Sequence, residues 1–278
     1  MRTILLAGGF LLFAAAPAFA QDIYVPPRAA DGHADLGAVW SNAGEDVIIS
    51  QIVDGVLRSV PYEDPTEAKL PLRNPDAALA WRRQYGVYMS GQPQPEFTLG
   101  PDSLPNRDRC LMAANAAAPP MTSQGYNDAY AMVQTPDHVV IGVEMMDEAR
   151  IIRIVASAAE ATAAHGPRAL QRWTGDSVGW WEGDTLVVET VNVNTRQASQ
   201  SPIPTSPDAK VLERFMRTAG WELTYSAEVI DPVLYERPFT LSYTFHRTPR
   251  MWEYACHEGN YGMPNILSGV RETERLAK

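Results

Sequence analysis

The chain has 278 residues, a hydrophobic fraction of 45% and a formal net charge of −10. This length and composition predict one large globular domain or two small ones. Because the chain is acidic and has no run of basic residues, its composition argues against nucleic-acid binding and favours a small-molecule ligand or substrate as the partner. The sequence does not determine an oligomeric state.

Residues 1–20 have the pattern of a secretory signal peptide. Arg2 supplies the positive charge, residues 4–16 form the apolar run, and residues 18–20 fit a small-x-small cleavage site. The apolar run is too short to cross a membrane, and no other stretch approaches a membrane span. We therefore expect an exported protein, periplasmic or secreted, that begins near Gln21 and has no membrane span.

The first third of the mature chain, residues 21–125, is predicted to be irregular and partly helical. Residues 35–40 resemble an opening strand. A helix is predicted at 74–85, because Asn caps a first turn well and Pro fits the first helical position. The proline-rich stretch 91–125 is predicted to be a long loop, and such loops are often functional. We expect this third to wrap the rest of a single domain, residues 21–278.

Residues 126–262 carry a strong β pattern. The clearest hairpin joins 177–181 to 185–190 through a turn in which Gly183 suits a positive φ. The other predicted strands are 130–134, 138–145, 150–155, 211–216, 222–230, 239–246 and 251–257. Strands in series favour an antiparallel meander, and closure into a barrel or a strongly bent sheet removes exposed edges. The predicted fold class is thus mainly β, with a C-terminal helix at 263–278.

The two cysteines, Cys110 and Cys256, favour a disulfide, because their number is even and the protein is expected to be exported. Two buried free thiols are the alternative. A disulfide would hold Arg107 and Arg109 near the stretch 252–261. The five histidines lack the spacing of a metal site, and no motif indicates another cofactor, so we expect neither.

The stretch 252–261 concentrates more chemistry than any other ten residues. If it is a strand, Glu258 lies at the edge of a packed face shared with Trp252, Tyr254 and Cys256. A desolvated carboxylate has a raised pKa and can transfer a proton near neutral pH. A structural carboxylate bonded to backbone is the alternative. The predicted catalytic residues are Glu258, His257 and Tyr261, with Asn260 or Arg150 orienting the substrate.

Two further groups of residues are candidates for binding. Glu144 and Arg150 are predicted to pair across a hairpin, which we favour over a substrate carboxylate held by Arg150. Trp180 and Trp181 are adjacent in a strand, so they must point to opposite faces, and one of them lies outside the core. The predicted substrate-binding residues are Asn260, Arg150, Glu144, Trp181, Tyr254 and Arg109.

Several motifs recur in the same order in a family of proteins. They include V-Q-T-P-D at 133–137, W-T-G-D-S at 173–177, W-E-G-D-T-L-V-V at 181–188 and Y-A-C-H-E-G-N-Y at 254–261. Over roughly residues 105–272 the chain resembles a large group of secreted bacterial proteins, and this resemblance implies no particular activity. The chain departs from that pattern at three places. It has Asp128 where Asn is usual and Lys210 where His is usual. At 157–166 it lacks the Gly-Arg-x-His stretch that the group often has, so His165 is only a doubtful counterpart of that histidine.

Two functional hypotheses follow from these residues. The first is an exported enzyme without a cofactor that performs acid–base chemistry, as a lyase, isomerase or hydrolase, on a small neutral molecule such as a sugar or a plant-derived aromatic. The second is a non-catalytic periplasmic β-barrel that binds a ligand with Trp180 or Trp181 and Tyr254. Two titratable side chains that converge within hydrogen-bond reach would favour the enzyme, and an all-apolar pocket with isolated polar groups would favour the binder.

Overall fold

The computed structural model describes residues 24–61, 70–74, 76, 106–113, 116–123, 125–198 and 201–276. The expected signal peptide and nearly all of the helix expected at 74–85 lie outside the described residues. The strands are β1 (Ala38–Ser41), β2 (Ile48–Val53), β3 (Val56–Pro61), β4 (Ala129–Gln134), β5 (His138–Val143), β6 (Glu148–Ile154), β7 (Asp176–Glu182), β8 (Thr185–Val191), β9 (Lys210–Ala219), β10 (Glu222–Ile230) and β11 (Phe239–Arg247). The helices are η2 (Met145–Asp147), α2 (Ala158–Ala164), α3 (Thr195–Ala198) and α4 (Gly262–Leu276).

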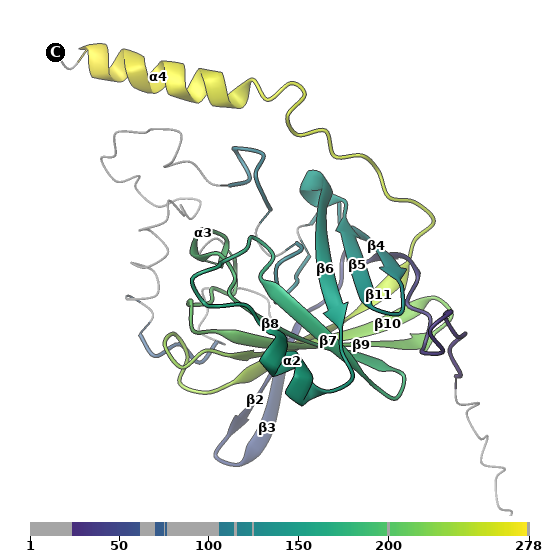
Figure 1. Ribbon diagram of the computed structural model, residues 1–278. Helices are drawn as coiled ribbons and strands as arrows, with labels where there is room; N and C mark the ends of the chain where they lie inside the picture. Colours follow the sequence, from purple (N-terminus) through teal and green to yellow (C-terminus); the bar gives the residue numbers. More distant parts are fainter. Residues whose placement is uncertain are drawn as a thin grey trace, which may run out of the picture.

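Nine of the strands form a closed barrel (Figure 1). The barrel closes because β1 pairs with both β4 and β11, and β2 and β3 extend the sheet from β11 as a hairpin. This confirms the prediction of a mainly β fold that closes into a barrel. One junction differs from a pure meander: β6 and β7 run parallel, and α2 lies in the connection between them.

The lumen of the barrel is filled by side chains. Along β10 burial alternates residue by residue, as expected where one face of a strand points to the core. Large aromatic residues from β1, β4, β9, β10 and β11 occupy the interior, and the fully buried members are Trp40, Tyr130, Phe215, Tyr225, Phe239 and Phe245. The lumen is therefore a packed core, as in other small barrels.

Loop residues also enter the barrel. We call residues 106–113 and 116–123 the plug; among them Met112, Ala116, Ala117 and Met121 have no exposed surface. The backbone N–H of Met121 donates to the Tyr225 hydroxyl at 3.0 Å, and the Tyr243 hydroxyl donates to the Met121 carbonyl at 3.0 Å. The described part of the predicted long loop thus contributes to the core.

A disulfide joins the plug to the segment that follows β11. Cys110 and Cys256, 146 positions apart, are bonded, which confirms the predicted pair. The strand predicted at 251–257 is wrong, because residues 248–261 contain no strand. The edges of β11 are already paired with β10, β1 and β2, so β11 offers this segment no free edge. The predicted C-terminal helix is present as α4, whose residues are all at least partly exposed.

None of the helices in the described chain has the length and apolar character needed to cross a membrane.

Candidate functional site

A pocket of about 420 Å³ lies beside the disulfide, between the plug and the segment that follows β11. We call it the disulfide pocket. The plug contributes charged side chains to its wall, and the segment after β11 contributes polar and aromatic ones. The lining residues are Arg107, Asp108, Tyr126, Glu253, Tyr254, Ala255, Cys256 and Asn260.

Asn260 connects the two sides of this pocket. Its side-chain amide donates to the Asp108 carbonyl at 3.1 Å and lies 3.1 Å from Cys110 Sγ. Its side-chain oxygen accepts from the backbone N–H of Met263, in the first turn of α4, at 3.3 Å. The asparagine therefore fixes the turn after Cys256 against the plug, and the pocket wall with it.

Tyr254 and Tyr126 form the aromatic part of the wall. Burial raises the pKa of Tyr254, and the neighbouring Tyr126 raises it further through its proximity and a hydrogen bond, while Arg107 acts in the opposite direction. Because the raised pKa lies far above neutral pH, the Tyr254 phenol stays protonated. Its chemistry is therefore that of a hydrogen-bond donor rather than that of a base.

The structure brings together only some of the predicted site residues. Tyr254 and Asn260 line the disulfide pocket, and Arg109 lies half-buried next to Cys110. The three predicted catalytic residues, Glu258, His257 and Tyr261, are exposed at the turn after the disulfide. The expectation that Glu258 sits at the edge of a packed face is therefore wrong, since the strand that would have placed it there does not form.

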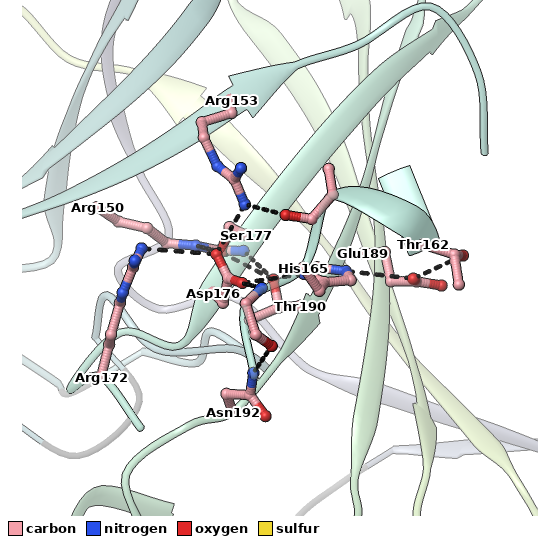
Figure 2. A network of polar contacts seen from close by, with 12 residues as sticks. Arg150, Arg153, Thr162, His165, Arg172, Asp176, Ser177, Glu189, Thr190 and Asn192 are labelled. Carbon is pink, nitrogen blue, oxygen red and sulfur yellow. Dashed lines mark hydrogen bonds and ion pairs between the residues drawn. The ribbon is translucent and has the colours of Figure 1, made fainter. Parts of the chain in front are cut away.

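Arg150 lies in the lumen and is sealed from solvent. Its guanidinium forms a two-point ion pair with Glu213 of β9, with Nη1 at 2.9 Å from Oε1 and Nη2 bonded to Oε2. It also donates to Ser177 Oγ at 3.0 Å and to Thr190 Oγ1 at 2.8 Å (Figure 2). The predicted pair between Glu144 and Arg150 is wrong: Glu144 accepts from the side chain of Asn127 at 2.8 Å.

Glu213 accepts a further hydrogen bond besides those from Arg150. Its Oε1 accepts from the Tyr225 hydroxyl at 2.9 Å, and Tyr225 in turn is bonded to the plug backbone. Burial is the main reason that the pKa of Tyr225 is well above its usual value. Because every partner in this network is another buried group of the chain, Arg150 is placed to hold the lumen together and has no donor directed at solvent.

A second polar cluster lies outside the lumen, under α2 (Figure 2). It is on the outer face of β7 and β8, where Ala161 of α2 packs on Val178 and Val187. His165, which follows α2, lies between two carboxylates: its Nδ1 is 3.4 Å from Asp176 Oδ2, and its Nε2 is 3.2 Å from Glu189 Oε1. The second contact is too poorly aligned to count as a hydrogen bond.

Both carboxylates in this cluster have further partners. Asp176 accepts from Arg153 at 2.9 Å and from the Gly166 N–H at 2.7 Å, and Glu189 accepts from Thr162 at 2.9 Å and pairs with Lys210 at 3.1 Å. Burial acts to raise the pKa of each acid, but these donors and cations together hold both pKa values below the usual range. The cluster thus fastens α2 and the following turn to the barrel.

The sequence pointed to this cluster only through two departures from the pattern of the similar proteins: the stretch 157–166, which contains His165, and Lys210. The available signal was alternation: Asp176, Val178 and Trp180 share one face of β7, so an acid on that face next to buried residues implies a partner.

The adjacent tryptophans point to opposite faces, as predicted. Trp180 belongs to the small outer cluster under α2, and its indole N–H donates to Glu182 at 3.0 Å. Trp181 packs against the main core, and its ring stacks on His33 with centroids 4.7 Å apart. Since His33 covers the ring, Trp181 does not offer an open stacking surface to a ligand.

In the described ranges of the chain, no group of three or more His, Cys, Asp or Glu side chains is arranged to hold a metal ion. The fold and the pocket define the class of this protein as a closed, core-filled β-barrel with a polar pocket at a disulfide outside the lumen. Comparison of the chain with protein-family models, with curated proteins and with solved structures gives no match.

Proposed function

We propose that this protein is an exported, periplasmic or secreted binder of a small neutral molecule of the sugar class, held in the disulfide pocket. The observation that carries the proposal is the lining itself. Two tyrosines stand beside an amide, a guanidinium and two carboxylates in one pocket of about 420 Å³. This volume is in the ordinary range for small-molecule sites.

The chemistry of the lining favours a polyhydroxylated ligand. Sugar hydroxyls both donate and accept, so carboxylates such as Asp108 and Glu253 and donors such as Arg107 and protonated Tyr254 can each bond one. Tyrosine rings supply apolar faces for the C–H surface of a sugar ring. An anionic ligand is disfavoured, because the lining has two acids and a single base.

The position of the pocket changes the ligand-binding hypothesis drawn from the sequence. That hypothesis expected Trp180 or Trp181 to help bind the ligand, but both lie in packed clusters. Aromatic side chains and the plug fill the lumen, so a site outside the barrel fits the described chain better. Export is supported by the disulfide, since such bonds persist in oxidising compartments.

Acid–base catalysis on the same ligand is the second candidate. It is favoured by two carboxyl groups, Asp108 and Glu253, that line the same pocket from its two sides, with Glu258 five positions after Glu253 in the chain. It ranks second because no hydrogen bond joins these carboxyl groups to each other or to another titratable side chain of the described lining. Two titratable groups at one ligand are the minimum for general acid–base chemistry.

The test is to measure binding of a panel of neutral mono- and disaccharides by saturation-transfer NMR, followed by titration calorimetry on any sugar that binds. Tyr254→Ala should weaken binding at least about tenfold, because it removes both the ring contact and the donor. Tyr261→Ala is the matched control, because Tyr261 is 75% exposed and does not line the pocket.

Three outcomes decide between the possibilities. Binding that is lost in Tyr254→Ala and kept in Tyr261→Ala supports the proposal. If no sugar of the panel binds, or if both variants bind like the parent protein, the proposal fails. If the NMR spectrum of the sugar changes with time, and Glu253→Gln or Glu258→Gln stops this change, the enzyme hypothesis replaces the binder.

A further inference from the structure

The β2–β3 hairpin projects beyond the barrel. β11 pairs with β2 only at Ile48, Ile49 and Ser50, whereas β2 and β3 pair along six rungs. The end of the hairpin therefore extends away from the barrel wall (Figure 1). Its base is anchored, because Ile49 is fully buried in the core and Gln51 accepts from Arg237 at 3.0 Å.

The projecting part is apolar and exposed. Ile52, Val56 and Leu57 are 63%, 58% and 68% exposed. Within residues 48–61 the only charged side chains are Asp54 and Arg58, so the hairpin carries no net charge on a chain of net charge −10. At a neutral apolar projection, two copies of an acidic protein meet with little charge repulsion.

One edge of β3 has no partner strand among the described residues, because β3 is the last strand in the sheet order. Asp54 and Gly55 both have positive φ, 52° and 76°, which is typical of a two-residue type I′ turn. Such a turn closes with a hydrogen-bonded pair, here Val53 and Val56. In an antiparallel pair, successive residues direct their backbone groups alternately toward and away from the partner strand. Leu57 and Ser59 therefore direct their N–H and C=O groups to the open edge.

We propose that the open edge of β3 is a self-association surface, at which two copies of this chain pair β3 with β3 in antiparallel orientation about a two-fold axis. The alternation allows several registers, and we choose the one with Leu57 opposite Leu57 of the second copy. Leu57 opposite Ser59 would place Arg58 opposite Arg58, and Ser59 opposite Ser59 would place Leu57 opposite Pro61, which has no N–H. Backbone hydrogen bonds form between the two Leu57 residues, one on each side of the axis. Unprotected edge strands with apolar side chains are known templates for such pairing.

The charges of the hairpin are complementary in this register. Arg58 lies opposite Val56 of the second copy, and the turn that carries Asp54 of the second copy begins beyond Val56, within reach of the long arginine side chain. The two-fold axis repeats the contact, so one dimer contains two such pairs. Among the described residues no ion pair joins Asp54 or Arg58 to another side chain, so both charges are open to this contact.

Analytical ultracentrifugation of the mature protein, from micromolar to submillimolar concentration, tests the association. We expect a concentration-dependent monomer–dimer equilibrium. Leu57→Lys should raise the dissociation constant at least about tenfold, because the axis places two like charges together. Val133→Lys is the matched control, since Val133 is 57% exposed but lies on β4, which has a partner on both sides.

A pair of charge variants tests the register. In a dimer of Arg58→Glu, each new Glu lies beside Asp54 of the second copy, and in a dimer of Asp54→Lys, each new Lys lies beside Arg58 of the second copy. Like charges meet in both cases, so each variant alone should stay monomeric. An equimolar mixture should associate again, because every diagonal pair in the mixed dimer has opposite charges. Circular dichroism and thermal unfolding verify that each variant is folded.

The proposal is supported if Leu57→Lys dissociates the dimer, Val133→Lys does not, and the two charge variants associate only when mixed. It is overturned if the parent protein is monomeric throughout the range. It is equally overturned if a dimer forms but is unchanged by Leu57→Lys, or if mixing the charge variants restores nothing. Hydrogen exchange that is slow at Leu57 and Ser59 in a monomer would show that another segment of the same chain covers the edge.

Discussion

Replacing Glu213 by Gln tests whether the buried ion pair in the lumen determines stability. The side chains of Arg150 and Glu213 are 1% and 0% exposed. Glu213→Gln keeps the shape of the side chain but leaves the Arg150 cation without a counter-charge in a medium of low polarity. The two-point ion pair and the acceptor for the Tyr225 hydroxyl are both weakened by this change.

The expected loss of stability is about 3–5 kcal/mol, the usual cost of removing one partner of a buried pair. For a protein of this size, that corresponds to a fall in melting temperature of roughly 10 °C. Glu182→Gln is the matched control. It removes the same kind of charge from an ion pair with Arg214 whose side chains are 47% and 43% exposed, and surface pairs contribute less than about 1 kcal/mol.

Equilibrium unfolding in urea measures both variants, and the double variant Arg150→Met with Glu213→Leu completes the comparison. Because the double change removes both charges, it should destabilise the protein less than Glu213→Gln does alone. A loss below about 1 kcal/mol in Glu213→Gln, or a double variant less stable than either single one, would refute the reasoning.

Two further predictions concern pH and the disulfide. Burial raises the pKa of Glu148 to about 8, and one of its carboxyl oxygens is buried without a hydrogen-bond partner. Folding therefore favours the protonated acid, so the contribution of Glu148 to stability is complete below its usual pKa of 4.5 and is lost as the pH rises toward 8. Glu148→Gln should flatten this part of the profile of melting temperature against pH, and parallel profiles for the two proteins would contradict the assignment. Replacing Cys110 and Cys256 together by Ser opens a loop of 146 residues, for which the chain-entropy model gives roughly 4–5 kcal/mol. Urea unfolding measures the loss, and unchanged stability would mean that the cross-link does not restrict the unfolded chain.

The strands of the barrel could be predicted because their patterns are local. The hairpin of β7 and β8, with Gly183 at φ 63°, follows from residues within a dozen positions. The parallel pairing of β6 with β7 was missed, since the crossover through α2 has only seven helical residues and a weak pattern. A short Ala-rich stretch does not distinguish an insertion from a crossover helix.

The partner of Arg150 could not be predicted from neighbours in sequence. Glu144 is six positions away, but Glu213, 63 positions away, is the actual partner, because barrel closure brings β9 across the lumen from β6. A signal did exist: Glu213 alternates with Val211 and Phe215, so it had to face the core. Arg150 has the same property beside Ile152 in β6, and two opposite charges on inward faces predict each other.

Part of the stretch predicted as a site, 252–261, lines the disulfide pocket, but the three predicted catalytic residues do not. The alternation of Trp252, Tyr254 and Cys256 resembles a strand, but pattern alone cannot reveal that β11 has no free edge. The segment therefore stays irregular, and Glu258 is exposed. The disulfide at Cys256 holds Tyr254 and Asn260 at the pocket. The disulfide itself could be predicted from the two cysteines.

The closure of the barrel by β1 sets an order on how the chain can fold. Trp40 in β1 pairs with Arg247 in β11, so the last rung joins residues from the two ends of the barrel sequence. Synthesis proceeds from the N-terminus, so β1 cannot make this contact until β11 has been synthesised. Contacts of such long sequence separation make folding slow and leave unpaired edges exposed meanwhile. We therefore expect that the nascent protein depends on a holding chaperone until its final strand is released.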